Sequence, residues 1–222
     1  MKRGFGTNFH SVYLNNAEVY DIFSRAEIFS KKLIAEIKKS TRGDILLDLA
    51  CGTGHKTNIF SKFFKKVYAL DKSKELLSFA EKKYSKNKKV SYLLSSADKI
   101  PLLDNSVDSV IVTWGSFPLT KTIKEINRVL KPGGVALRIG VYGIDELTSL
   151  FPKFDIKRIN RIKKVFEKSG YKPQKDIIKI NFNNIKEAKN VLSIVLNIDK
   201  NKIIKKDFLH EIIIYKYVKS II

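Results

Sequence analysis

The chain has 222 residues, of which 44% are hydrophobic and 29% charged, as expected for a globular domain with a real core. No apolar run approaches the roughly 18 residues that span a bilayer, and the N-terminus lacks the apolar segment of a secretory signal. The single cysteine excludes an internal disulfide and any CxxC metal site. We therefore expect a cytoplasmic protein without a metal.

The net charge of +21 has two interpretations. It is compatible with a polyanionic partner, nucleic acid above all. It also fits a compositional bias, because Lys, Ile, Asn, Phe and Tyr are all abundant and have codons rich in A and T. Lysine heavily outnumbers arginine, whose fork suits specific phosphate and base recognition. Since the lysines are spread over nearly every predicted helix, we favour the compositional interpretation.

The N-terminal part is predicted to be an arm followed by a helix. Residues 1–16 carry Gly, Asn and aromatic residues without periodicity. Asn16 is a candidate cap for a helix that runs to about Lys39, broken or bent near Ser24, with apolar residues at helical spacing. Arg42 and Gly43 end this helix, and the first strand follows.

Strands and helices then alternate, which predicts crossover connections and a parallel sheet covered on both faces. Strands are expected over 45–48, 67–71, 90–94, 107–113 and 135–141. Helices are expected over 57–66, 73–84 and 120–130, the last one stopped by the sequence KPGG.

The rhythm changes after residue 141. A longer connection with a possible helical turn at 145–150 leads to a helix over 157–168. A strand over 177–182, a helix over 185–196 and a final strand over 208–218 follow. We find no internal repeat and no low-complexity linker, so a single domain is expected.

The sequence DILLDLACGTG at 44–54 is the centre of the predicted site. A buried strand leads through Asp48 into a turn that contains Gly52 and Gly54, and a helix follows. Glycine accepts a positive φ and lets a ligand approach the backbone. A dinucleotide fingerprint would have a third glycine where Thr57 stands, and an acid about 20 residues on suits either kind of cofactor.

Three stretches together resemble the class I S-adenosylmethionine-dependent methyltransferases. They are LLDLACGTG at 46–54, VYALDKSKELLSFA at 67–80, and IPLLDNSVDSVIV at 100–112 followed by EINRVLKPGG at 125–134. The nearest group is that of the ubiquinone and menaquinone methyltransferases (methyltransferase type 11). The downstream match at Asp108 and KPGG favours the methyl donor over a dinucleotide.

The resemblance implies a three-layer, doubly wound Rossmann-like α/β sandwich. Its sheet would have seven mostly parallel strands, with an antiparallel last strand. We expect one methyltransferase domain over 1–222. Within it, 1–40 forms a lid arm and helix, 44–141 the cofactor-binding core, and 142–222 the substrate-side loop, helices and last two strands.

The cofactor has a ribose diol, an adenine and a methionine tail but no phosphate. A carboxylate that ends the second strand can accept both ribose hydroxyls, which is the role the resemblance implies for Asp71. Asp48 resembles the acid that holds the cofactor's amino group. The full set of cofactor candidates is Asp48, Ala50, Gly52, Gly54, Asp71, Lys72, Ser96, Ala97, Asp98 and Thr113.

Three of these candidates depart from the family pattern. Ala50 replaces the first glycine of the turn, which we interpret as a mild change. Lys72 stands where the family has an apolar residue against adenine, so its stem would serve there. The adenine-contacting Asp of the family aligns with Ser96, with Asp98 two residues later.

The acceptor is expected where the fourth strand ends, at TWGSFP over 113–118. This stretch lacks the (Asp/Asn)-Pro-Pro-(Tyr/Phe) motif of amino-directed nucleic-acid methyltransferases, which favours a small-molecule or lipid-like acceptor. Two alternatives stay open: an RNA methyltransferase that uses the basic surface, and a non-catalytic binding module of the same fold. The pocket candidates are Tyr13, Tyr20, Trp114 and Tyr142.

Methyl transfer from a sulfonium needs alignment and dehydration, and a base only if the nucleophile carries a proton. The weak catalytic candidates are His10 and Tyr20. For His55 and His210, as for His10, a structural or solvated role is favoured. Cys51 is not expected to act as a nucleophile. The aromatic arm predicts a lid, so that deleting residues 1–14 would keep the fold and abolish transfer.

Overall fold

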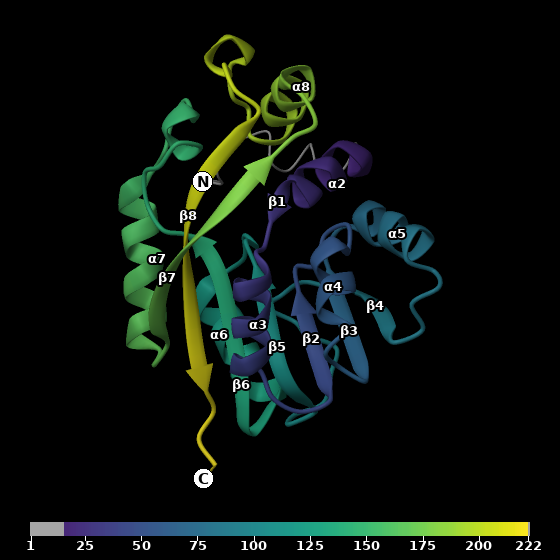
Figure 1. The fold of residues 1–222 in the computed structure, drawn as a ribbon. Coiled ribbons are helices and arrows are strands. Elements are labelled where there is room, and N and C mark those ends of the chain that lie inside the picture. Colours follow the sequence, from purple (N-terminus) through teal and green to yellow (C-terminus); the bar gives the residue numbers. More distant parts are fainter. Residues whose placement is uncertain (1–15, 222) are drawn as a thin grey trace.

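The structure, a computed structural model, describes residues 16–221 and is built on one eight-stranded sheet with the order β1-β7-β8-β6-β5-β2-β3-β4 (Figure 1). The strands are β1 (Glu27–Ile28), β2 (Ile45–Leu49), β3 (Lys66–Asp71), β4 (Val90–Leu94), β5 (Val107–Thr113), β6 (Leu130–Val141), β7 (Lys172–Asn181) and β8 (Asp207–Val218).

The helices connect these strands. They are α2 (Ala17–Ala26), α3 (Lys31–Ser40), α4 (His55–Phe60), α5 (Lys74–Lys83), α6 (Leu119–Val129), α7 (Ile156–Lys168) and α8 (Ile185–Val195), with short 3₁₀ turns η1 (Thr148–Leu150) and η2 (Lys200–Lys202). None of them is long and apolar enough to cross a membrane.

Strands β2 to β6 run parallel, and β8 lies antiparallel between β6 and β7. This confirms the doubly wound sheet with an antiparallel last strand. The strand count was one too low, because the two-residue β1 adds an eighth strand at the edge of β7.

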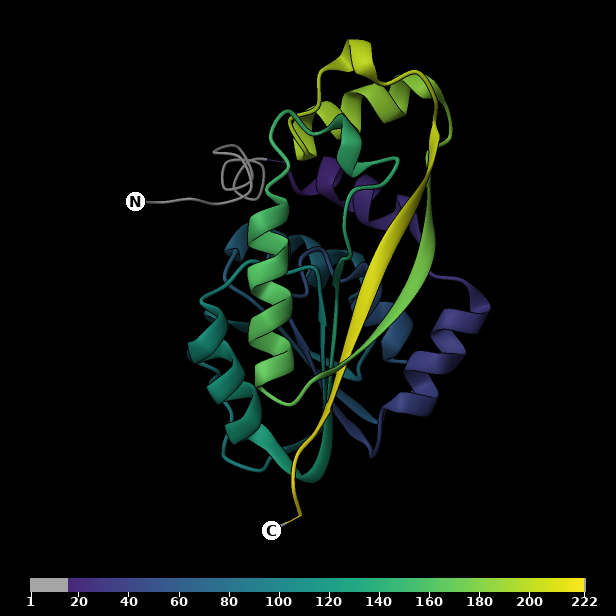
Figure 2. The same ribbon diagram turned by 90° about the vertical axis from the view of Figure 1, so that its left-hand side faces the viewer.

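Two hydrophobic cores lie on the two faces of the sheet. Figure 2 shows α6 and α7 on one side and α3 on the other. Leu33 of α3 and Phe60 of α4 belong to the larger core, together with residues of α2 and α8. Phe166 of α7 and Ile126 of α6 belong to the second core. Helices α2 and α8 pack on each other at the end where the parallel strands point (Figure 1).

The predicted first helix is interrupted, as expected, but at Glu27 and Ile28 rather than near Ser24. Glu27 and Ile28 leave the helix to pair with Ile180 and Lys179 of β7, so a sheet edge competes successfully with helix propensity. The side chain of Ser30 then caps α3 by accepting a hydrogen bond from the Leu33 amide at 3.0 Å. Asn16 does precede α2, but its side chain makes no capping hydrogen bond.

Three other predicted boundaries shift. Helix α4 ends at Phe60 rather than 66, because the Lys65 amide donates to the Asp44 carbonyl and draws the chain back to the sheet. Strand β6 begins at Leu130, ahead of KPGG, where Leu130 pairs with Val107. Strand β7 begins at Lys172 rather than 177. The prediction missed its first five residues, KPQKD, because they lack the apolar alternation that marks a strand.

The downstream motif stabilises the end of the sheet away from the glycine turn. Asp108 accepts hydrogen bonds from the Asp44 and Ile45 amides at 3.0 and 2.9 Å, and pairs with Lys131 at 2.8 Å. A Cβ on Gly43 would lie 2.3 Å from the Asp108 side chain, so that position needs glycine. These motif residues therefore support the fold rather than a site.

Candidate functional site

The turn after β2 is built from left-handed residues. Ala50, Gly52 and Gly54 have φ values of 64°, 56° and 74°. The Cys51 amide donates to the Leu70 carbonyl at 3.0 Å, which fixes the turn against the end of β3. A left-handed alanine costs about 1 kcal/mol relative to glycine, so the replacement of the first glycine is paid for in backbone strain.

The two glycines of the turn face different neighbours. A Cβ on Gly52 would lie 3.0 Å from a ring carbon of Tyr20, so the ring of α2 rests on the turn. A Cβ on Gly54 would lie 3.1 Å from the Cβ of Ala80 and 3.4 Å from the Tyr92 hydroxyl. Gly54 therefore allows close packing with α5, and Gly52 allows close packing with the Tyr20 ring of α2.

Asp48 ends its strand fully buried and incompletely paired. Its Oδ2 accepts a hydrogen bond from Thr57 Oγ1 at 2.6 Å. Its Oδ1 is also buried and has no partner within residues 16–221. Burial raises the pKa of Asp48 to about 7, with the Asp71 charge adding to it and the Thr57 hydrogen bond opposing it. A buried oxygen without a donor indicates a missing hydrogen-bonding group.

Asp71 ends the neighbouring strand β3 and faces the same turn. Its Oδ2 accepts from the Gly52 amide and its Oδ1 from the Ser73 amide, both at 2.9 Å. Burial raises the pKa of Asp71, although these amide hydrogen bonds favour the ionised form. Each carboxylate oxygen retains a second lone pair, so the group can accept further hydrogen bonds from a ligand.

The predicted adenine loop lies beside Asp71. The Ser95 amide donates to the Asp71 carbonyl at 3.0 Å, which brings the next residues to the same edge. Ser96 Oγ donates to Asp98; Ser96 is exposed, Asp98 is half-buried and Ala97 is buried. That hydrogen bond lowers the pKa of Asp98. Lys72 also lies at this edge, but it is exposed, so its aliphatic stem is not buried there as predicted.

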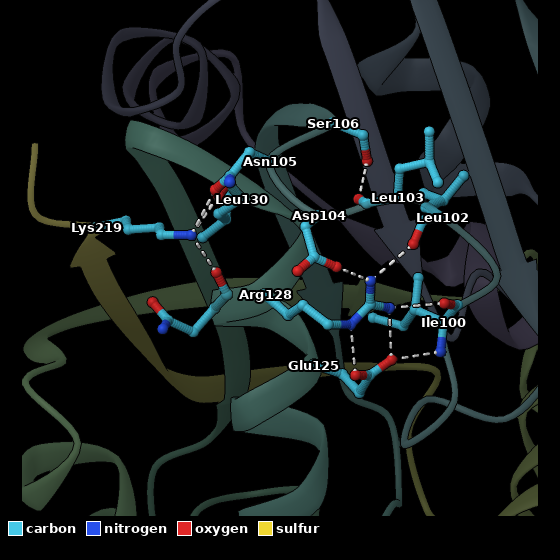
Figure 3. A network of polar contacts seen from close by, with 11 residues as sticks. Ile100, Leu102, Leu103, Asp104, Asn105, Ser106, Glu125, Arg128, Leu130 and Lys219 are labelled. Atoms are coloured by element: carbon cyan, nitrogen blue, oxygen red, sulfur yellow. Dashed lines mark hydrogen bonds and ion pairs between the residues drawn. The ribbon is translucent and has the colours of Figure 1, made fainter.

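A polar network holds the continuation of this loop (Figure 3). The Ile100 amide donates to Glu125 at 2.8 Å, and Arg128 donates to the Ile100 and Leu102 carbonyls, both at 2.8 Å. Arg128 also pairs with Glu125 at 2.7 Å and with Asp104 at 2.8 Å. The network fixes the 100–104 segment to α6, and so limits the movement of the loop that starts beside Asp71.

The end of β5 abuts the glycine turn. Thr113 is buried, and Trp114 and Gly115 follow with φ values of 65° and 44°. A Cβ on Gly115 would lie 3.3 Å from the Cβ of Ala50. The indole Nε1 of Trp114 donates to Glu27 Oε2 at 3.0 Å. The predicted acceptor segment and cofactor turn are therefore adjacent.

Sequence reasoning missed a buried ion pair behind Trp114. Lys56 Nζ donates to the Ser24 and Glu27 carbonyls at 2.6 and 3.0 Å, and lies 3.5 Å from Glu27 Oε2. Burial raises the pKa of Glu27 and lowers that of Lys56, and each charge counteracts the effect on the other. A Lys and a Glu 29 residues apart carry no signal of pairing, since both residue types usually mark solvated helix faces.

Tyr20 and Trp114 lie on the same face of the sheet, where they pack against the larger core, and Tyr142 lies on the other, against the second core. The Tyr142 ring lies between Lys163 and Lys175, at 3.9 and 4.0 Å from their Nζ atoms. The candidates His10 and Tyr13 lie outside the described residues.

The other two histidines have different surroundings. His55 begins α4, and burial together with the Lys56 charge lowers its pKa to about 4. His210 is buried on β8, with its ring centroid 5.4 Å from that of Trp114. Cys51 is buried, and burial raises the pKa of its thiol, as expected for an unreactive cysteine.

Residues 47–137 match the family model described as methyltransferase domain. Malonyl-[acyl-carrier protein] O-methyltransferase of Yersinia pestis is 30% identical over 64% of this chain and 54% of its own length. Putative methyltransferase YqeM of Bacillus subtilis is 31% identical over 64% and 60%. Demethylmenaquinone methyltransferase of Staphylococcus aureus is 30% identical over 58% of each. The chain thus spans about half to three-fifths of these relatives.

Solved structures share the fold. The YcgJ protein of Bacillus subtilis superposes with a TM-score of 0.61 at 17% identity, over 84% of this chain and 97% of that one. A SAM-dependent methyltransferase of Aquifex aeolicus superposes with a TM-score of 0.57 at 22% identity, over 89% and 97%.

Residues 47–137 therefore resemble a methyltransferase domain, and the chain has the fold of solved methyltransferases. This match indicates S-adenosylmethionine as the cofactor.

Proposed function

We propose that this chain transfers the methyl group of S-adenosylmethionine to a small-molecule or lipid-like acceptor, with the carboxyl ends of β2, β3 and β5 as the binding site. In this proposal Asp71 accepts the ribose hydroxyls, Ser96, Ala97 and Asp98 flank the adenine, and Thr113 lies beside the methionine end. The bound cofactor supplies a methyl group on an already activated sulfonium.

The observation that carries the proposal is Oδ1 of Asp48, a buried acceptor to which no group among the described residues donates a hydrogen bond. Leaving a buried acceptor without a donor costs about 1–3 kcal/mol, more for a charged group. The cofactor's ammonium group has the right charge and hydrogen-bonding capacity to satisfy it.

The chain's own contribution to the reaction is alignment and the exclusion of water. Tyr20 rests on Gly52, and Trp114 closes the side of the turn toward β8. Both rings also belong to the larger core, so their positions are held by packing. An aromatic wall with a phenolic or indole hydrogen-bonding group suits an acceptor that is largely apolar.

The acceptor class is supported by two observations. Relatives include enzymes named for malonyl-[acyl-carrier protein] and for demethylmenaquinone. The segment after β5, Thr113–Trp114–Gly115–Ser116–Phe117–Pro118, lacks the motif that holds a nucleic-acid base amine. The whole of 1–222 is proposed to act as one unit in this reaction.

The test is methyl transfer to an unbiased set of acceptors. The protein is incubated with methyl-labelled S-adenosylmethionine and a cell extract separated into lipid, small-molecule, protein and RNA fractions. We expect label in the lipid or small-molecule fraction, and none with an Asp48→Asn, Asp71→Asn double variant that remains folded. Label confined to the RNA fraction would contradict the proposed acceptor and support the RNA alternative.

A further inference from the structure

A buried histidine and aspartate lie together at the carboxyl end of the sheet, outside the cofactor residues. His210 Nδ1 is 2.7 Å from Asp145 Oδ2, and each side chain is only 4% exposed. His210 lies on β8, and Asp145 lies on the connection that follows β6. The two residues are 65 positions apart in the chain, so the pairing is a product of the fold.

Asp145 is fixed and ionised. Its Oδ1 accepts from the Leu147 and Thr148 amides at 3.0 and 2.9 Å, and its Oδ2 also accepts from the Glu211 amide at 2.9 Å. Burial raises the pKa of Asp145, but the His210 hydrogen bond and charge and these amides outweigh it, and the pKa lies below its ordinary value.

A carboxylate at Nδ1 sets the tautomer of the imidazole. Because the Asp145 carboxylate can only accept, the neutral form of the imidazole carries its hydrogen on Nδ1 and keeps its lone pair on Nε2. No residue within 16–221 forms a hydrogen bond with Nε2. An imidazole that is oriented by a carboxylate in this way acts as the base in many unrelated enzymes.

The pair is next to the proposed acceptor site. The His210 ring lies 5.4 Å from the Trp114 ring, and the residue after Trp114 contacts the glycine turn at Ala50. The charged groups that face His210 are Asp145 from the connection and Glu27 from β1, and Lys56 of α4 pairs with Glu27. Strand β1 and the connection after β6 therefore lie around His210 beside the end of β5.

We propose that His210, oriented by Asp145, is the general base of this methyltransferase, and that the acceptor is therefore a phenol or enol hydroxyl rather than a carboxylate. The inference rests on the proposed function. A carboxylate acceptor is already deprotonated at neutral pH and needs no base, whereas a hydroxyl must lose its proton as it attacks.

The step balances with groups that are present. The hydroxyl proton passes to Nε2, and the oxygen's electron pair forms the bond to the methyl carbon. The carbon–sulfur pair stays on sulfur, and neutral S-adenosylhomocysteine leaves. Asp145 stabilises the imidazolium that forms, which then releases its proton to solvent when the site opens.

Two variants separate the base from its structural hydrogen bond. In His210→Asn the side-chain amide can still donate to Asp145 where Nδ1 did, but nothing replaces Nε2. In Asp145→Asn the amide can donate to Nδ1, which favours the wrong tautomer. Tyr217→Phe is the matched control, because it removes a hydrogen bond to Asn127 at the far end of the same strand.

The assay uses 1,4-naphthohydroquinone, kept reduced, and a malonyl thioester as acceptor probes with labelled S-adenosylmethionine. We expect transfer to the hydroquinone alone, with a pH-dependent rate. His210→Asn should lower this rate at least 100-fold and remove the pH dependence, while Tyr217→Phe leaves both unchanged.

A second measurement does not depend on turnover. The chain has three histidines, so ¹⁵N-histidine labelling gives a simple spectrum, and the signal missing from His210→Asn assigns His210. We expect the Nε2 signal to shift when the hydroquinone is added with S-adenosylhomocysteine. An unchanged Nε2 signal would overturn the proposal.

Failure of this proposal is distinguishable from failure of the proposed function. Calorimetry with S-adenosylhomocysteine should give the same affinity for the wild type and His210→Asn. If the wild type binds but transfers only to the malonyl thioester, or to neither probe, the base and acceptor class are wrong. If His210→Asn keeps the pH-dependent rate, His210 is structural. A wild type that does not bind the cofactor product would reject the proposed function itself.

Discussion

The parallel half of the sheet (β2 to β5) and the antiparallel half (β1, β7 and β8) treat buried charge in opposite ways. At the end of β2, Asp48 keeps one buried oxygen without a partner in the described chain. In the antiparallel half, Glu27 pairs with Lys56, and His210 pairs with Asp145. We infer that the open acceptor marks the place of a ligand, whereas the paired charges fix the segments that surround it.

The largest effect is expected when a buried ion pair of the antiparallel half loses one partner. Lys56→Met would leave Glu27 buried without its cation, and removing one partner of a buried pair costs about 3–5 kcal/mol. We expect urea denaturation to show a fall of this size in the free energy of unfolding.

The double variant provides the control. Adding Glu27→Gln to Lys56→Met removes the stranded charge but keeps an acceptor for Trp114 Nε1, so most of the lost stability should return. If Lys56→Met lowers the free energy of unfolding by less than about 1 kcal/mol, the buried pair contributes no more to stability than a surface salt bridge does.

The open acceptor of the parallel half predicts a pH-dependent affinity. The pKa of Asp48 in the folded protein is raised to about 7, above its value in the unfolded chain. The neutral carboxyl group therefore stabilises the ligand-free protein fully below the unfolded pKa, and this stabilisation is lost as the pH rises to about 7. The cofactor's ammonium needs the ionised form. Affinity for S-adenosylhomocysteine should therefore rise by up to roughly tenfold per pH unit between pH 5 and 7.

Calorimetry in buffers with different ionisation enthalpies measures this effect, because binding below pH 7 should release a proton. Asp48→Asn should bind more weakly, without proton release in that range. The same proton release from Asp48→Asn as from the wild type would assign the titration to another group.

The smallest expected effect concerns the strained turn. Ala50→Gly removes the left-handed alanine, and we expect a gain in stability of about 0.5–1 kcal/mol after the greater chain entropy of glycine is included. Thermal melts compared with Ala97→Gly, a buried alanine without a positive φ, measure it. A loss of stability in Ala50→Gly would show that the methyl group packs usefully against the β5 loop.

The same contrast explains what the sequence could predict. Strands β4 and β5 have the predicted bounds, since short apolar runs with turn residues on both sides fit buried parallel strands. Asp48 and Asp71 were predicted because each ends such a strand and matches a family motif. In the antiparallel half, β1 was missed, because two residues are too few for any periodic pattern.

Buried pairs in the antiparallel half were invisible for a different reason. Lys56 was read as part of an ordinary helix, and Asp145 as part of a connection. Their roles depend on contacts with Glu27 and His210, which only the folded chain brings close. Side chains that pair across long separations leave no local signal in one sequence, whereas a carboxylate at the end of a strand does.

The most direct test of the central claim is calorimetric titration of S-adenosylhomocysteine into the wild type and Asp71→Asn. Asp44→Asn is the matched control, an exposed carboxylate before β2 whose partner is Lys65. We expect the wild type and the control to bind S-adenosylhomocysteine. For a folded Asp71→Asn we expect a loss of about 2 kcal/mol in binding free energy, or roughly 30-fold in affinity, because two ribose hydroxyls lose a charged acceptor. Equal affinities for all three proteins would contradict the assignment of the site.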